Sequence, residues 1–148
     1  MTLTNHMLTG AVLGKFLPWP VAVPLAFISH FVLDASPHFW LKTGAEHPKN
    51  RIIIGAVVAI DIISAVIISI WLITSGHISQ FYIGLVAYSP DLPWIYRFAI
   101  KEKFGKLQPS KGNRFIQFHM NIQKYERPWG IFVEVLYGAT MFMILLRI

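Results

Sequence analysis

A histidine and an aspartate stand four residues apart at His30 and Asp34. In a helix this spacing puts both side chains on one face. His38 follows four residues later, but Pro37 is expected to end the helix before it. Imidazole and carboxylate donors together suit Zn²⁺, Mn²⁺ or Fe²⁺, and such sites often keep a position for a water molecule that the metal acidifies. The spacing alone is also compatible with a hydrogen-bonded His–Asp pair, so both interpretations stay open.

The composition indicates what kind of protein must position these side chains. Of the 148 residues, 55% are hydrophobic and only 14% are charged, whereas a soluble domain averages about 25% charged residues. The chain has no cysteine, which excludes disulfide scaffolds, cysteine zinc sites and thiol catalysis. In so apolar a chain, a net charge of +6 is more typical of membrane topology than of nucleic-acid binding. We therefore expect a single membrane domain over residues 1–148 and no nucleic-acid partner.

Three apolar stretches predict membrane-spanning helices: residues 51–74, 80–100 and 129–146. Their lengths are close to the roughly 20 residues that cross a hydrocarbon core of ~30 Å. Two prolines near the end of the second stretch are expected to break or kink it. Residues 3–35 form two shorter apolar arms, predicted to be a helical hairpin that either crosses the membrane or re-enters it. The predicted fold class is all-α, a polytopic integral membrane bundle of about five hydrophobic helices.

The basic residues give the expected orientation of these helices. Lys and Arg cluster in residues 36–51 and 97–127 and are absent from residues 75–79. By the positive-inside rule, the first two segments are cytoplasmic and the third is external, so five crossings place the N-terminus in the cytoplasm. The basic cytoplasmic segment, residues 99–127, is expected to lie on membrane lipid, which would be anionic.

This topology places ionisable side chains at the cytoplasmic face. It is assigned from Lys and Arg alone, so the positions of His and Asp are an independent observation. Ionisable groups in or near a membrane are energetically costly and require a reason. The groups gathered at this face are the predicted metal ligands: His6, His30, Asp34, His38, Asp91 and His119. Their convergence makes a metal site as well supported as a hydrogen-bonded cluster.

Two acidic residues fall inside the predicted spans. Asp61 lies ten residues into its span, a depth of ~15 Å at about 1.5 Å per residue. A charged carboxylate there costs at least about 2.5–3.5 kcal/mol, so we expect it to be protonated, hydrogen-bonded to another helix or orienting a histidine. Glu134 is expected to be a metal ligand, a general base or a buried polar contact. Thr2 or Thr4 is expected to cap the first helix.

Several short motifs follow one another along the chain: Thr4-Asn5-His6, Ser29-His30 followed by Asp34 and Pro37-His38, Ser89-Pro90-Asp91-Leu92, and Phe118-His119. In this order they resemble the small bacterial membrane proteins described as membrane-bound metal-dependent hydrolases. The block from Ser29 to His38 is the most specific of them. The resemblance implies a bacterial cytoplasmic membrane and metal ligands at the six residues named above. It also implies a second histidine shortly after His119, where this chain has Gln123.

Three functions are compatible with this pattern. The first is a metal-dependent hydrolase at the cytoplasmic face, with a divalent metal, Zn²⁺ before Mn²⁺ or Fe²⁺, acting on a lipid-like or phosphate-bearing ester. In this hypothesis the substrate is an amphiphilic small molecule, and the predicted catalytic residues are Asp91, His119 and Glu134. The second is a non-catalytic membrane protein with a structural metal or polar cluster. The third is a small ion or proton transporter, in which Asp61, Asp91 and Glu134 mark a path.

Overall fold

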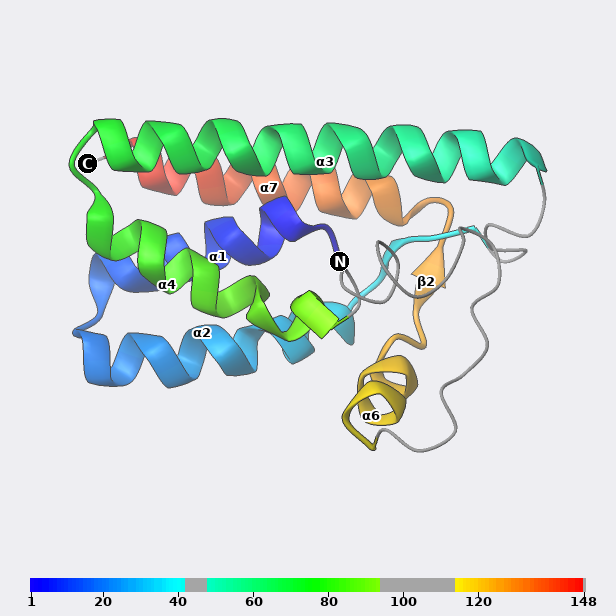
Figure 1. Ribbon diagram of the computed structural model, residues 1–148, viewed down its shortest axis with the longest axis horizontal. Coiled ribbons are helices and arrows are strands. Elements are labelled where there is room, and N and C mark those ends of the chain that lie inside the picture. The colour runs from blue at the N-terminus through cyan, green and yellow to red at the C-terminus, as the bar shows by residue number, and fades with distance from the viewer. Residues whose placement is uncertain (42–47, 94–113, 148) are drawn as a thin grey trace.

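Six α-helices, a short 3₁₀ turn and a pair of two-residue strands make up the described part of the chain (Figure 1). The computed structural model describes residues 1–41, 48–93 and 114–147. The helices are α1 (Leu3–Phe16), α2 (Trp19–Asp34), α3 (Pro48–Thr74), α4 (Ile78–Tyr88), α6 (Arg114–Ile122) and α7 (Gly130–Leu146). The 3₁₀ turn is η2 (Ser89–Asp91), and the strands are β1 (His38–Phe39) and β2 (Glu126–Arg127). The predicted all-α class is confirmed.

Helix α3 confirms the helix predicted over residues 51–74. Its 27 residues extend about 40 Å at about 1.5 Å per residue. Among the described helices, its stretch Ile52–Thr74 is the one long and apolar enough to cross a membrane, with a mean hydropathy of 2.7 in its most apolar window. Only 11% of that window is buried inside the protein, so the helix is not a core helix shielded by its neighbours.

The other predicted helical segments are present but shorter. Residues 3–35 form α1 and α2, which are joined around Leu17 and Pro18 as the predicted hairpin requires. In the stretch predicted over residues 80–100, α4 ends at Tyr88 and the chain enters η2, so the break at the prolines is confirmed. The end of that stretch, and the part of the basic segment 99–127 that precedes α6, lie outside the described residues.

Four helix ends meet at one end of the bundle. In Figure 1, α1 and α7 begin on the side of the molecule where α2 and η2 finish, and α6 lies next to them. Strands β1 and β2 tie this end together, because they pair in parallel with His38 opposite Glu126 and Phe39 opposite Arg127. Gly130 follows β2 and packs on β1 so closely that a Cβ would lie 2.1 Å from the carbonyl carbon of His38. A residue with a side chain would push the start of α7 away.

The interior of the described bundle holds polar as well as apolar side chains, the latter in clusters that include Leu8, Leu72 and Ile83. The buried polar side chains are Asn5, His6, His30, Asp34, His38, His119 and Glu134. Large apolar side chains are exposed along α2, α3 and α7; for example, Ile52 and Phe132 are each 76% exposed and Leu136 is 70% exposed. Apolar faces of this extent mark a surface that meets something other than water.

Helices α1 and α4 pack with their backbones close together. A Cβ at Gly10 would lie 2.5 Å from the carbonyl oxygen of Ile83 and 2.8 Å from the Cα of Gly84. Ala87 of α4 and Ala26 of α2 are fully buried beside this contact region. Small residues at facing positions let apolar helices approach closely enough for extensive van der Waals contact.

The substitution Gly10→Ala should destabilise the fold by about 1–3 kcal/mol, because its methyl group would collide with the backbone of α4. Gly55→Ala in α3 is the matched control, since a Cβ there meets nothing within 4 Å. That control should be neutral or stabilising by up to about 1 kcal/mol through helix propensity. The Tm of each detergent-purified variant, followed by circular dichroism, tests this; equal Tm values for the two variants would contradict the close α1–α4 contact.

Candidate metal centre

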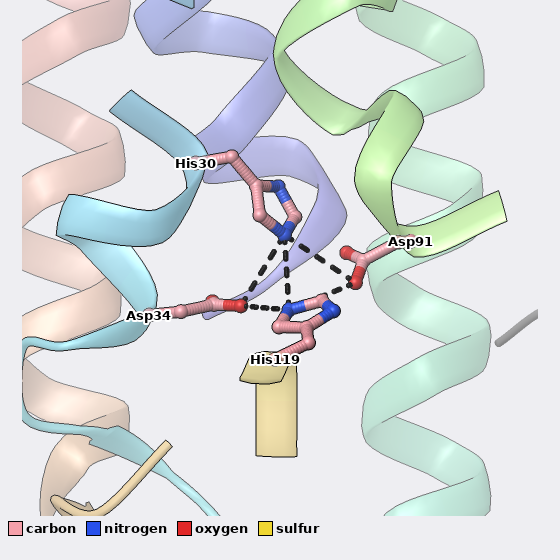
Figure 2. A group of neighbouring side chains, drawn as sticks. All are labelled: His30, Asp34, Asp91 and His119. Carbon is pink, nitrogen blue, oxygen red and sulfur yellow. Dashed lines mark hydrogen bonds and ion pairs between the residues drawn. The ribbon is translucent and has the colours of Figure 1, made fainter. Parts of the chain in front are cut away.

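Two histidines and two aspartates meet where the helix ends converge (Figure 2). His30 and Asp34 come from the end of α2, Asp91 from η2 and His119 from α6. One donor atom from each lies within 4.8 Å of the other three. His30, Asp34 and His119 are almost completely buried, and the side chain of Asp91 is 21% exposed. Four of the six predicted ligands are therefore brought to one point.

The spacing of the four donor atoms is close to that of ligands around one ion. The Nε2 atom of His30 lies 3.1 Å from His119 Nε2, 3.3 Å from Asp34 Oδ2 and 3.6 Å from Asp91 Oδ1. The Nε2 atom of His119 lies 2.6 Å from Asp34 Oδ2 and 3.8 Å from Asp91 Oδ1. Ligands bound at about 2.0–2.2 Å to a tetrahedral ion are roughly 3.3–3.6 Å apart. The group could hold a metal ion after shifts of up to about 1 Å, the largest being the separation of His119 Nε2 from Asp34 Oδ2.

The backbone of α4 orients His30. The Nδ1–H of His30 donates a hydrogen bond to the carbonyl oxygen of Ala87, with the two atoms 3.0 Å apart. This contact holds the proton on Nδ1 and turns Nε2 toward the other donors, which is the arrangement that metal-binding histidines require. The sequence carries no signal for this contact, because any residue type supplies a backbone carbonyl.

Asp34 accepts hydrogen bonds on both of its oxygens. The Nε2–H of His6 donates to Oδ1 at 3.1 Å, and the side-chain amide of Gln123 donates to Oδ2 at 3.2 Å. The Met1 amino group also contacts Oδ1. Gln123 stands where the resemblance implied a second histidine, and here it supports a carboxylate of the group. Such outer contacts fix the direction from which a ligand approaches an ion.

His6 and His38 lie outside the group of four. The ring of His6 stacks on that of His30, with centroids 4.0 Å apart, and its Nε2 is already bonded to Asp34. The Nε2 of His38 lies 3.8 Å from Oε1 of Glu126. His6 thus supports a candidate ligand, and His38 faces a different carboxylate; a direct role of either in metal binding stays a prediction.

Carboxylates from two other helices cap the start of α1. Both oxygens of Asp61 accept backbone N–H groups, from Leu3 at 2.8 Å and from Thr4 at 2.9 Å, and Oε1 of Glu134 accepts the N–H of Thr2 at 3.0 Å. The prediction that Thr2 or Thr4 caps the helix is confirmed in position, because Thr2 is the N-cap residue of α1, but its side chain does not make the cap. Thr2 makes no side-chain cap, and the hydroxyl of Thr4 donates to the carbonyl oxygen of Asp61 at 3.0 Å. The N–H groups at a helix start lack partners within the helix and favour negative charge. This need explains why Asp61 and Glu134 are placed at the start of α1.

A cavity of about 380 Å³ adjoins the four donors, because Asp91 forms part of its wall. Gln123, which is bonded to Asp34, forms another part. The other polar side chains that line the cavity are Thr2, His38, Asp61, Glu126 and Glu134. Two methionines, three residues of α3 and two aromatic residues of and after β1 complete the described lining: Met1, Met120, Ile54, Val57, Val58, Phe39 and Trp40. A small molecule in this cavity would contact the edge of the candidate metal centre.

Burial raises the pKa of Asp91, which lies in η2 beyond the end of α4. The neighbouring charge on His30 acts against this rise and that on Asp34 adds to it. Removing a carboxylate from water disfavours its charged form. A divalent cation between the four donors would supply the missing positive charge, so the electrostatics of Asp91 fit a bound metal.

No protein-family model, curated protein or solved structure matches the chain. The identity of an ion therefore has to be inferred from the donors, which are two imidazole nitrogens and two carboxylate oxygens. Zinc is typically bound by such nitrogen and oxygen donors in a tetrahedral arrangement, and Mn²⁺ and Fe²⁺ accept the same donor types.

Replacing the cap should loosen the fold without touching the four donors. Asp61→Ala removes both acceptors from the first N–H groups of α1 and should destabilise the protein by about 0.5–2 kcal/mol. Thr74→Ala is a control in the same helix, because its exposed hydroxyl bonds only to carbonyl oxygens of the preceding turn. Thermal unfolding of both variants measures the difference, and an Asp61→Ala variant as stable as Thr74→Ala would contradict the proposed cap.

Metal binding should depend on His30 and not on a histidine elsewhere. His30→Ala removes a donor that faces the other three and should reduce the metal content of the purified protein to background. His77→Ala is the matched control, because His77 lies between α3 and α4 beside the ring of Trp71, outside the group of four. Elemental analysis after detergent purification tests this. Equal metal content in the two variants would contradict the assigned centre.

Proposed function

We propose that this protein is an integral membrane, metal-dependent hydrolase that cleaves a lipid-like ester. The metal would be held by His30, Asp34, Asp91 and His119. The observation that carries the proposal is that these donors are buried together and that one of them, Asp91, also lines a cavity. Because four protein donors already complete a tetrahedral shell, water or substrate would have to reach the ion as a fifth ligand, and the cavity at Asp91 gives it access.

The distribution of side chains supports a membrane location. Isoleucines along α3 and apolar residues of α2 and α7 face outward, while the ionisable groups are turned inward. A helix in contact with lipid has apolar side chains on its outer face, because hydrocarbon is the favourable environment for them. We propose that α1, α2, α3, α4 and α7 are embedded in a bacterial cytoplasmic membrane, with the end that carries the four donors toward the cytoplasm. The basic residues of the loops support this orientation.

A divalent ion in this position would supply the Lewis acid that polarises an ester and makes water a better nucleophile. The residues of the chain then have separate tasks. His30 and His119 present imidazole nitrogens, and Asp34 and Asp91 present carboxylates. Gln123 and His6 hold Asp34 in place through their hydrogen bonds.

His38 is suited to move the proton of the attacking water. It is 4% exposed and lines the cavity, and its Nδ1–H donates to the carbonyl oxygen of Ser36 at 2.8 Å. With the proton held on Nδ1, Nε2 of a neutral imidazole can accept a proton, and the Glu126 carboxylate 3.8 Å away would stabilise the imidazolium that forms. In the proposed reaction one ester bond breaks and the oxygen of water remains in the acid product. The proton taken by His38 is returned to the alcohol that leaves.

Two acidic residues favour the hydrolase over a transporter. In a proton path, Asp61 and Glu134 would take up and release protons inside the membrane. Both carboxylates instead accept N–H groups from the start of α1. The sequence motifs that resemble the membrane-bound metal-dependent hydrolases lend further support, since they include all four donors of the centre.

The substitution His38→Gln should lower hydrolysis by about 10²–10⁴-fold while the metal content stays unchanged. Activity would be measured in detergent on chromogenic carboxylate and phosphate esters with short acyl or alkyl chains, beside His30→Ala and His77→Ala. His30→Ala should lose metal and activity together, and His77→Ala should keep both. Full activity in metal-stripped wild-type protein would overturn the proposed function. Loss of metal from His38→Gln would show that His38 is a ligand and not the proton acceptor.

A further inference from the structure

The cavity beside the four donors is strongly acidic. Four carboxylates line it, those of Asp61, Asp91, Glu126 and Glu134. Among the described lining residues, the groups that can carry positive charge are His38 and the Met1 amino group, and there is no lysine or arginine. A cavity walled by one sign of charge concentrates ligands of the opposite sign.

Glu134 supplies an independent sign that a ligand belongs here. Its side chain is 4% exposed, and Oε1 accepts the N–H of Thr2 at 3.0 Å. Its other oxygen, Oε2, is buried and has no hydrogen-bond partner among the described residues. A buried carboxylate oxygen without a donor is unfavourable, because it loses its hydration and gains no hydrogen bond in return. A donor brought by a ligand in the cavity would remove this penalty.

The acidic excess persists when a metal is taken into account. A divalent ion on the four donors would offset the charges of Asp34 and Asp91. Asp61 is already bonded through both oxygens to the start of α1. The free oxygen of Glu134 then remains to meet a ligand. Glu126, whose side chain is 32% exposed, lies 3.8 Å from His38 and can contact the ligand as well.

The rest of the cavity wall fits an organic cation better than a hydrated metal ion. Ile54 and Val57 of α3 form an apolar side, and Phe39 and Trp40 add two aromatic rings. Ammonium groups bind over aromatic faces and beside carboxylates, and aliphatic carbon packs against branched apolar side chains. A hydrated metal ion would instead need oxygen ligands where these hydrocarbon groups stand.

We propose that the cavity binds an ammonium group through Glu134 and Glu126, and that the substrate is an ester whose head group carries an amine. The choice of substrate rests on the proposed hydrolase function, whereas binding of the cation does not require it. This substrate class differs from the phosphate-bearing ester that is predicted from the basic cytoplasmic segments of the sequence. A head group with phosphate alone would bring negative charge against unpaired carboxylates.

Calorimetric titration of the detergent-purified, full-length protein with two water-soluble probes of equal chain length tests the proposal. Wild-type protein should bind butylammonium, whose N–H groups can donate to Oε2 of Glu134, at least about tenfold more tightly than butyl phosphate. Glu134→Gln keeps the shape of the side chain and an acceptor for Thr2 but removes the charge. It should weaken ammonium binding by about tenfold with a small change in Tm. Glu126→Gln should weaken it as well, and Glu126→Asp should restore it.

The metal content of the same samples separates this inference from the proposed function. If ammonium binds as expected but no metal is present, the hydrolase proposal fails and the cation site stands. If metal binds and esters are cleaved, but wild-type protein prefers butyl phosphate or both charge-removing variants bind ammonium like wild type, the cation site is wrong. A second equivalent of divalent metal that disappears in Glu134→Gln would also overturn it, because the cavity would then be a metal site.

Discussion

The carboxylate of Asp34 is 1% exposed and is bonded by side chains from two elements other than its own helix. A carboxylate so deeply buried is tolerated only when it is paired and fully hydrogen-bonded. His6 therefore fixes the start of α1, and His119 and Gln123 fix α6, all by way of one group at the end of α2. Loss of Asp34 would leave buried imidazoles without their partner and would release elements that are far apart in the sequence. The candidate metal centre and the packing of this end of the bundle share that dependence.

The start of α1 is a second constraint with consequences for the site. Its free N–H groups require acceptors, and Asp61 from α3 and Glu134 from α7 supply them. These contacts hold three helices together and put two carboxylates into the wall of the cavity. Both carboxylate oxygens of Asp61 accept N–H groups of the cap, whereas Glu134 has one oxygen left for another partner. One structural requirement thus also determines the charge that a ligand in the cavity would meet.

Polar and apolar side chains share the interior of the bundle. Ionisable groups are buried with their partners, and apolar clusters that include Leu8, Leu72 and Ile83 are buried between the helices. Small residues let helices approach closely, as at the contact of Gly10 with α4. In Figure 1, the helix starts and ends that carry the ionisable groups lie at one end of the bundle, beside α6. The candidate metal centre lies at this end, and the cavity lined by Asp91 adjoins it.

The sequence by itself determined the all-α class, the long helix over residues 51–74 and the break near residue 90. It also predicted a convergence of six ligands, of which the structure brings His30, Asp34, Asp91 and His119 together. Hydrophobic run length and proline chemistry are local properties, and the positive-inside rule turns them into a topology that brings distant residues to one face. Only the tertiary structure decided that Asp61 and Glu134 cap α1, that His6 supports Asp34 and that a backbone carbonyl orients His30. Those assignments depend on distances and directions between helices, and periodicity along one helix does not encode which neighbour its polar groups will meet.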